Sequence, residues 1–348
     1  MNPYIMALLL FGLVLGTSIT VSSSHWLLAW MGLEINTLAI IPLMTQNHHP
    51  RAIEATTKYF LTQATAAATL LFASITNAWL TGQWDITQMT HPVPTTIITI
   101  ALAMKIGLAP LHTWLPEVLQ GLTLTTGLIL STWQKLAPFA LLVQMPCPNQ
   151  ELLILLGLTS TLVGGWGGLN QTQLRKILAY SSIAHLGWML LIIQFAPSLT
   201  LLALTMYLVM TTATFLTLKN NKATNINTLS TSWAKAPLLT AVTPLLLLSL
   251  GGLPPMTGFL PKWLILQELT KQQLPTTAVI AALTALLSLY FYLRLCYAMT
   301  LTMPPNNTSN TSLWRLPTYN ISLPLAISTL SAILLLPISP AIMALMNL

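Results

Sequence analysis

Three lysines lie within or against long apolar stretches of the sequence, where a charged side chain is unusual. They are Lys105, Lys135 and Lys262, and each has a proline within a few residues, at Pro110, Pro138 and Pro261. A charged side chain near the centre of a bilayer costs about 2.5–3.5 kcal/mol on insertion scales. A proline leaves a helical carbonyl without its usual donor. Buried charge beside an interrupted helix, repeated three times, predicts movement of ions or protons.

A buried lysine needs a neighbouring carboxylate if it is to stay charged, and otherwise sheds its proton. Glu34 is the only acid deep within the first three apolar stretches, so we expect it to pair with Lys105. Moving or neutralising that carboxylate would then switch the lysine between its charged and neutral forms, as proton transfer requires. Two histidines in the same kind of segment, His112 and His185, are candidate relays.

Each of these residues also has a purely structural interpretation. Lys262 follows a turn-rich segment and could extend its ammonium group to the membrane interface. His112 could cap the carbonyls freed by Pro110, and His185 could simply pack between helices. Lys135 has apolar neighbours on both sides, so extension to an interface explains it poorly.

The composition restricts the class of protein. Only 5% of the 348 residues are charged and 54% are hydrophobic, with a mean hydropathy of +0.73, whereas soluble domains carry about 25% charged residues. The net charge of +7 comes from scattered basic residues, without the basic and aromatic patch that binds nucleic acid. The sequence therefore predicts a polytopic membrane protein that binds no nucleic acid.

A membrane-spanning helix needs about 20 apolar residues, and we expect eleven such helices in an all-α bundle. Their ranges are 3–22, 25–44, 57–80, 94–121, 122–144, 151–169, 175–195, 198–218, 236–271, 275–301 and 322–345. The fourth is interrupted near Pro110 and the ninth at the segment 251–258.

The charges between these helices predict the orientation of the chain. With the N-terminus inside, the inner loops hold the basic residues Arg51, Lys58, Arg175, Lys176, Lys219, Lys222, Lys235 and Arg315. The outer loops hold Asp85, Glu151 and, near a helix end, Lys271. This is the asymmetry of the positive-inside rule. An odd number of spans then places the C-terminus outside.

The two interrupted helices are five helices apart. A five-helix unit that is repeated must invert in the membrane because five is odd, and interrupted helices at matching places of two inverted halves are typical of transporter sites. We expect one membrane domain over 1–348, with five-helix units at 1–144 and 151–301 and a terminal helix at 322–345. No residue-level identity between the halves is evident, so this expectation depends on helix order alone.

No motif indicates redox or nucleotide chemistry in this chain. The two cysteines, Cys147 and Cys296, lack metal-binding spacing, and no glycine-rich dinucleotide motif follows a strand. We therefore expect no cofactor in the chain itself.

Four long segments resemble a known family. They are MKIGLAPLHTWLPEVLQG (104–121), WQKLAP (133–138), LRKILAYSSIAHLGWM (174–189) and GGLPPMTGFLPKW (251–263). With these segments, and along its whole length, the chain resembles the subunit 2 family of NADH dehydrogenase (ubiquinone), antiporter-like subunits of vertebrate mitochondrial respiratory complex I. Full-length bacterial members begin with three further helices, so eleven helices match the shortened animal form. Lysine at 262 favours subunit 2 over its sibling subunit 4.

The resemblance implies a function and the residues that perform it. The proton-path residues would be Glu34, Lys105, Lys135 and Lys262, and the family's histidine positions fall on His112 and His185. The chain would translocate protons as a subunit of NADH:ubiquinone oxidoreductase, whose NADH, FMN, iron–sulfur clusters and ubiquinone are bound by other subunits. A stand-alone cation/proton antiporter and a purely structural membrane-arm subunit stay open as alternatives.

The resemblance also implies a location and partners. It predicts the mitochondrial inner membrane, with the N-terminus on the matrix side and the C-terminus on the intermembrane-space side. Other membrane-arm subunits, accessory subunits and phospholipids, cardiolipin included, would surround the chain.

Overall fold

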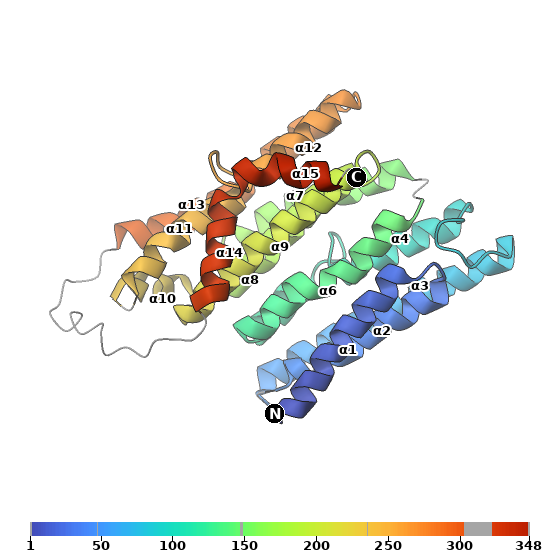
Figure 1. Ribbon diagram of the computed structural model, residues 1–348, viewed down its shortest axis with the longest axis horizontal. Coiled ribbons are helices and arrows are strands. Elements are labelled where there is room, and N and C mark those ends of the chain that lie inside the picture. Colours follow the sequence, from blue (N-terminus) through green and yellow to red (C-terminus); the bar gives the residue numbers. More distant parts are fainter. Residues whose placement is uncertain (1, 47, 147–148, 235, 303–321, 347–348) are drawn as a thin grey trace. The chain divides into compact units, whose positions relative to one another are not determined.

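A computed structural model of the chain describes residues 2–46, 48–146, 149–234, 236–302 and 322–346. The predictions for Cys147, Lys235 and Arg315 fall outside these ranges. Within them the chain forms helices and no strand, apart from two isolated β-bridges (Figure 1). The all-helical class predicted from the sequence is therefore confirmed.

The helices follow the predicted order. They are α1 (Pro3–Ser22), α2 (Trp26–Met44), α3 (Pro50–Thr81), α4 (Pro92–Ile106), α5 (Trp114–Gly121), α6 (Leu124–Gln144), α7 (Gln150–Gly168), α8 (Leu174–Ile192), α9 (Pro197–Asn220), α10 (Ile226–Ser230), α11 (Pro237–Gly251), α12 (Phe259–Lys271), α13 (Pro275–Leu301), α14 (Ser322–Leu334) and α15 (Ser339–Met346). The interruption expected near Pro110 separates α4 from α5, and the one expected at 251–258 separates α11 from α12.

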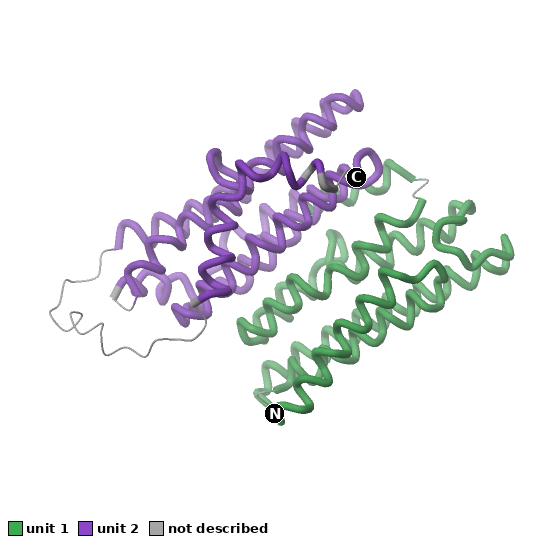
Figure 2. Tube along the Cα trace, viewed as in Figure 1, with its two compact units in different colours: residues 1–160 green, residues 161–348 purple. Residues whose placement is uncertain are grey.

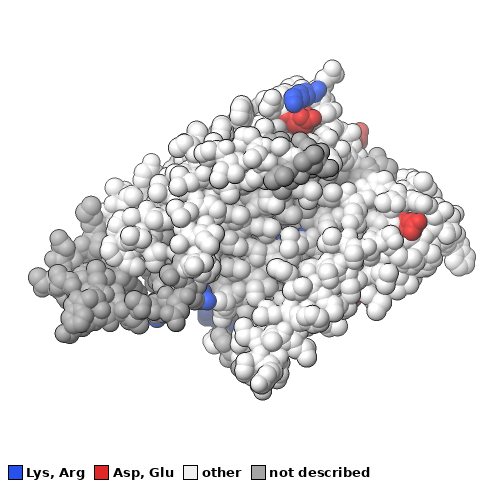
Figure 3. Space-filling view, in the orientation of Figure 1, with Lys and Arg blue, Asp and Glu red and all other residues white. Residues whose placement is uncertain are grey.

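Several of the helices have the length and the apolar composition of membrane spans. Seven of the described helices are long and apolar enough to cross a bilayer, and α14 with α15, bent by 69°, can be counted as an eighth. The first halves of the interrupted helices, α4 and α11, are shorter and also apolar. On the face shown in Figure 3, uncharged residues cover nearly all of the surface that the described residues form. Such a surface suits lipid rather than water.

Two predicted helices differ from the structure. The third begins at Pro50 instead of residue 57, because the backbone N–H of Arg51 donates to Nδ1 of His49 and caps the first turn. The predicted span omits residues 50–56, whereas in the structure these residues form the first turns of the same helix. The last predicted helix, 322–345, is divided by a 3₁₀ turn over Leu336–Ile338. Pro337 lies in that turn. It has no backbone N–H and therefore cannot form the hydrogen bond that would continue the helix.

The chain divides into two compact units, residues 1–160 and 161–348 (Figure 2). In the first unit, α2 packs on α1 and α3, α3 also contacts α4 and α5, and α6 contacts α1, α2 and α4. In the second unit, α9 contacts α8, α11, α12, α14 and α15, while α13 contacts α8, α10, α11 and α12. The predicted five-helix boundaries, 1–144 and 151–301, stay a prediction.

The two interrupted helices share one local design. Their first halves, α4 and α11, have 15 residues each and a proline in the first turn. Each ends at a glycine with positive φ, at Gly107 (86°) and Gly252 (78°), a conformation that favours glycine. The residue after each glycine donates its N–H to a carbonyl in the last turn, from Leu108 to Ala103 and from Leu253 to Leu248.

This shared design reveals a short residue-level repeat that was not evident from the sequence alone. Aligned on the two glycines, 107–119 reads GLAPLHTWLPEVL and 252–264 reads GLPPMTGFLPKWL. The positions identical in both are Gly107, Leu108, Pro110, Leu115, Pro116 and Leu119. The same alignment pairs Glu117 with Lys262 and Lys105 with Leu250. The backbone design has been kept in both segments while the charges differ.

An isolated β-bridge also recurs in each unit. The bridges join His25 to Asp85 in the first unit and Gln173 to Asn225 in the second. Beside them, N–H···O hydrogen bonds of 3.1 Å from Trp26 to Trp84 and of 3.0 Å from Leu174 to Thr224 have the same register. Each bridge ties the loop before the second helix of a predicted five-helix unit to the loop after its third helix. The recurrence is therefore found in the loops as well as in the interrupted helices.

Candidate functional site

The first unit encloses a cavity between α2, α3, α4, α5 and α6. Its polar lining consists of Asn36, Thr37, Tyr59, Gln63, Lys105, Trp114, Gln134 and Lys135. The volume open to the centre of a water molecule is about 20 Å³, and one water needs about 10–15 Å³ on this measure. The cavity therefore has room for about one water among two lysines and several amides and hydroxyls.

Lys105 lies in the last turn of α4 and is only 5% exposed. Its ammonium nitrogen is buried and has no hydrogen-bond partner among the described residues. The expected partner, Glu34, interacts with it electrostatically. However, the described part of the chain has no ion pair between them within 4.0 Å, and Glu34 Oε2 accepts a 3.0 Å hydrogen bond from the Thr37 hydroxyl. The acid thus acts on the lysine across a gap.

Side chains on α3 and α5 compensate for the interruption of the helix at Lys105. The last carbonyls of a helix lack intrahelical donors, and a buried unpaired carbonyl costs about 1–3 kcal/mol. Trp114 Nε1 donates to the carbonyl of Met104 at 3.1 Å, and Gln63 Nε2 donates to the carbonyl of Lys105 at 3.4 Å. Since Trp114 belongs to α5, the second half-helix closes over the end of the first.

Lys135 lies on α6, is only 2% exposed, and lines the same cavity as Lys105. Pro138 occupies the interior of α6 and removes the donor that would reach the Gln134 carbonyl. The side chain of Gln134 donates to the Asn36 carbonyl on α2 at 3.3 Å. The structure therefore brings two of the three predicted lysines into one polar cavity.

His112 lies in the segment between α4 and α5 and is half-buried. It forms a hydrogen bond with the backbone of Pro110, and its own carbonyl accepts from Leu115 N–H at 3.0 Å. It is not among the residues that line the cavity. His112 thus contacts the backbone of Pro110 itself, and both its relay role and its capping of the carbonyl freed by Pro110 stay predictions.

Lys262 lies in the first turn of α12, in the second unit, and is half-buried. Its Nζ donates to the carbonyl of Gly251, the last residue of α11, at 2.7 Å. A cation is favourable at the C-terminus of a helix. The ammonium group is thus directed back across the interruption, which disfavours its extension to the membrane interface.

His185 lies on α8 beside Tyr207 of α9, with 5.8 Å between the ring centroids. The neighbouring Ser182 forms a side-chain hydrogen bond with Tyr207, and Tyr207 is fully buried. The predicted relay residue therefore belongs to a polar cluster between two helices of the second unit.

Sequence reasoning missed the amides of the cavity and one half-buried arginine. Gln63 and Gln134 contact carbonyls of neighbouring helices. Arg294 of α13 donates to the carbonyls of Leu169 and Gln171, in the loop after α7. These residues could have been found by considering every polar residue within a long apolar helix. The prediction considered only lysines, acids and histidines. Among the described residues, no group of three His, Cys, Asp or Glu could hold a metal ion.

The sequence matches the NADH:quinone oxidoreductase/Mrp antiporter membrane family over residues 23–288 and the NADH dehydrogenase subunit 2 C-terminal family over residues 289–343. It is 72% identical over 347 residues to NADH-ubiquinone oxidoreductase chain 2 of Tetraodon nigroviridis, covering 100% of each chain. It is 70% identical over 349 residues to the corresponding chain of Oncorhynchus mykiss, again covering 100% of each.

Solved structures have the same fold. A chain of respiratory complex I from Thermus thermophilus, solved with bound aureothin, has 30% identity and a TM-score of 0.81, covering 96% of this chain and 80% of that one. A chain of the Mrp complex from Dietzia sp. DQ12-45-1b has 18% identity and a TM-score of 0.77, covering 97% and 74% respectively. The chain therefore belongs to the NADH dehydrogenase subunit 2 family, within the NADH:quinone oxidoreductase/Mrp antiporter membrane subunits.

Proposed function

We propose that this chain is a proton-translocating, antiporter-like subunit in the membrane arm of respiratory complex I, NADH:ubiquinone oxidoreductase. It carries protons, while NADH, FMN, the iron–sulfur clusters and ubiquinone are bound by other subunits. The relatives that match it over their full length are NADH-ubiquinone oxidoreductase chain 2 proteins. Their identity to this chain favours the complex over a stand-alone antiporter.

The observation that carries this proposal is the cavity shared by Lys105 and Lys135. Two ammonium groups repel each other, and more strongly in a low dielectric than in water. The Glu34 carboxylate interacts with Lys105 and stabilises the charge there. If Glu34 moves or is neutralised, Lys105 can release its proton to the cavity water while that water passes a proton to a neutral Lys135. The net change is the transfer of one proton from Lys105 to Lys135.

The histidines and Lys262 supply the rest of the proposed path. From Lys135 the proton passes by way of water and the histidines, His112 or His185, to Lys262. The bond of Lys262 to the Gly251 carbonyl stabilises its charged form at the helix interruption. Release of that proton to the far side would complete one transfer across the membrane.

We further propose eleven spans in two inverted five-helix units followed by a terminal span. The first unit would consist of α1, α2, α3, α4 with α5, and α6. The second would consist of α7, α8, α9, α11 with α12, and α13, and α14 with α15 would form the last span. The recurring interruption and the recurring β-bridge support this division, because each occupies the same place in both sets of helices.

The same proposal defines the surroundings of the chain. The subunit would lie in the mitochondrial inner membrane, with its N-terminus on the matrix side and its C-terminus on the intermembrane-space side. Membrane-arm and accessory subunits would contact it, and the basic inner loops would favour anionic phospholipid such as cardiolipin. The basic residues Arg175, Lys176, Lys219 and Lys222 support this side assignment.

Replacement of Lys105 by Ala tests the function. We expect the complex to assemble and to oxidise NADH, with fewer protons translocated per electron in reconstituted vesicles. Lys271→Ala is the matched control, because that lysine is 61% exposed at the end of α12. A normal proton yield from an assembled Lys105→Ala complex would contradict the proposal.

A further inference from the structure

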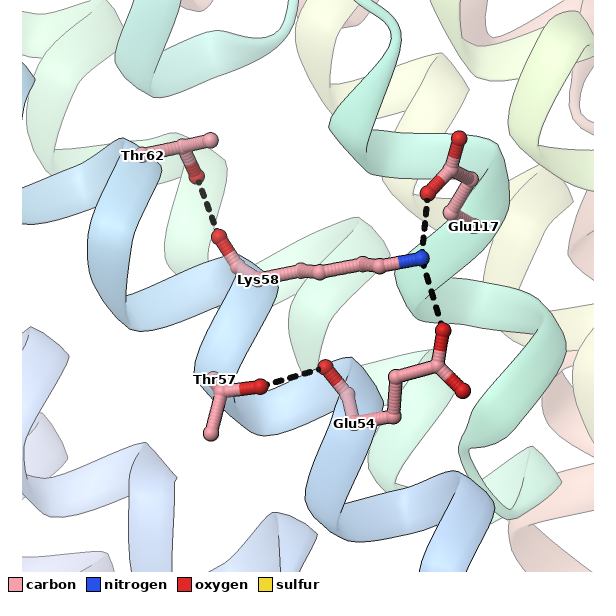
Figure 4. A network of polar contacts seen from close by, with 5 residues as sticks. All are labelled: Glu54, Thr57, Lys58, Thr62 and Glu117. Carbon is pink, nitrogen blue, oxygen red and sulfur yellow. Dashed lines mark hydrogen bonds and ion pairs between the residues drawn. The ribbon is translucent and has the colours of Figure 1, made fainter.

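One lysine on α3 holds two carboxylates at once (Figure 4). Lys58 Nζ lies 2.8 Å from Glu54 Oε1, one turn earlier on the same helix, and 2.8 Å from Glu117 Oε2 on α5. Of the ion pairs in the described ranges, Lys58–Glu117 alone joins two different helices. It connects the second half of the interrupted helix to its neighbour.

Glu117 occupies a special place in the internal repeat. It is the fourth residue of α5, as Lys262 is the fourth residue of α12. In the second unit, Lys262 secures the interruption by donating to the Gly251 carbonyl. An ionised acid cannot donate, so Glu117 has a different partner and accepts from Lys58. The charged residue at this position therefore has a partner in each unit. It is negative in the first unit, at Glu117, and positive in the second, at Lys262.

The half-helix that Glu117 belongs to depends on outside contacts. An isolated helix of eight residues, the length of α5, is not stable in water. Besides the ion pair, α5 contacts α3 through the rings of Trp114 and Tyr59, whose centroids are 5.7 Å apart. It also contacts α3 through Gly121, where an added Cβ would lie 2.6 Å from the Arg51 carbonyl oxygen. The ion pair lies between these two contacts along α5.

We propose that Lys58 is a positioning residue: its pair with Glu117 holds α5 on α3 and so keeps Trp114 in the wall of the Lys105 cavity. Glu54 assists by holding the Lys58 side chain extended toward α5. A displaced α5 would withdraw Trp114 Nε1 from the Met104 carbonyl and open the cavity beside Lys105. The consequence for proton transfer rests on the function proposed above, whereas the mechanical coupling does not.

Hydrogen–deuterium exchange of residues 107–121 in the assembled complex tests the coupling. The three charged side chains are 42–64% exposed, so solvent screens the pair and its contribution is small. We expect Lys58→Met to accelerate exchange modestly, by about two- to fivefold. Lys58→Arg should restore slow exchange, and so should the double exchange Lys58→Glu with Glu117→Lys, because a lysine at 117 can bridge both acids. Lys271→Met, which breaks a pair within a single helix, should leave this segment unchanged.

The outcomes separate this proposal from the proton path. Unchanged exchange in an assembled Lys58→Met complex overturns the positioning role, whatever the proton yield. Faster exchange that neither Lys58→Arg nor the charge exchange reverses also overturns it, because the effect is then not due to the pair. Faster exchange reversed by both variants supports it, even if Lys105→Ala pumps normally and the proton path itself fails.

Discussion

Replacing Gly252 by Ala would test whether Lys262 is directed across the helix interruption. Gly252 has φ of 78°, and an added Cβ would lie 2.8 Å from Lys262 Cδ and 2.9 Å from its Nζ. Both distances are shorter than real Cβ contacts allow, so the lysine must move. We expect it to lose its 2.7 Å bond to the Gly251 carbonyl.

The loss of stability expected from Gly252→Ala has two separate contributions. A residue other than glycine in the left-handed region costs about 1–2 kcal/mol. Loss of a hydrogen bond to a charged donor adds about 1.5–3 kcal/mol. We therefore expect Gly252→Ala to destabilise the second unit by about 2.5–5 kcal/mol. Gly82→Ala provides the matched control, because Gly82 also has positive φ, at 73°, but nothing lies within 4 Å of its added Cβ. That control should cost only the backbone part.

The assay compares the heat inactivation of NADH oxidation by assembled complexes, an activity that does not require Lys262. Gly252→Ala should lose NADH oxidation at a lower temperature than Gly82→Ala, and it should already translocate fewer protons per electron at ordinary temperature. In a Lys262→Ala background the added cost of Gly252→Ala should fall to that of the control, because the side chain it displaces is gone.

Equal behaviour of Gly252→Ala and Gly82→Ala would refute the reasoning, since it would mean that Lys262 does not occupy the space over Gly252. A cost that persists in the Lys262→Ala background would refute it too. In that case the strain would belong to the backbone of the interruption and not to the lysine.

Three further changes have defined outcomes. Trp114→Phe removes the donor to a buried carbonyl and should cost about 1–3 kcal/mol, seen as earlier heat inactivation of the assembled complex; an unchanged profile would contradict the capping role. Gly164→Ala places a Cβ 2.6 Å from the backbone nitrogen of Ala184 and should cost about 1–3 kcal/mol through overpacking, measured as a lower yield of complex on a native gel; a normal yield would show that the helices can separate. Lys105→Met should keep or improve heat resistance, because it removes a buried charge, while lowering proton yield; reduced assembly would instead indicate a structural lysine.

The sequence predicted the interrupted helices because proline and glycine act locally. Proline and glycine disfavour continuation of a helix, and the structure interrupts both helices at Pro110 and at the segment 251–258, although single prolines such as Pro138 lie within a continuous helix. The proximity of Lys105 and Lys135 is different, because it depends on how α4 packs against α6. Hydrophobic periodicity contains no such information in helices that are apolar on nearly every side.

Because sequence patterns do not show how helices pack, they also could not predict several contacts of the cavity. Gln63 donates a hydrogen bond to a carbonyl on another helix. A local sequence pattern cannot predict such a contact between helices. The repeat between 107–119 and 252–264 was present in the letters, but it is short and lies among long runs of leucine and alanine. Two glycines of matching φ were needed to set its register. Glu34 was identified from its depth in a helix, whereas its separation from Lys105 is a matter of side-chain geometry.

The different charges in the two repeated segments have a consequence for direction. Two identical halves related by inversion would look the same from either side of the membrane, so neither side would be distinguished as the source of protons. Here the shared backbone has Lys105 and Glu117 in one half and Leu250 and Lys262 in the other. If the two units are inverted as proposed, the two sides of the membrane are chemically unequal, although the local backbone design recurs in both units. In such a chain a few side chains, rather than the fold, supply the difference between entrance and exit.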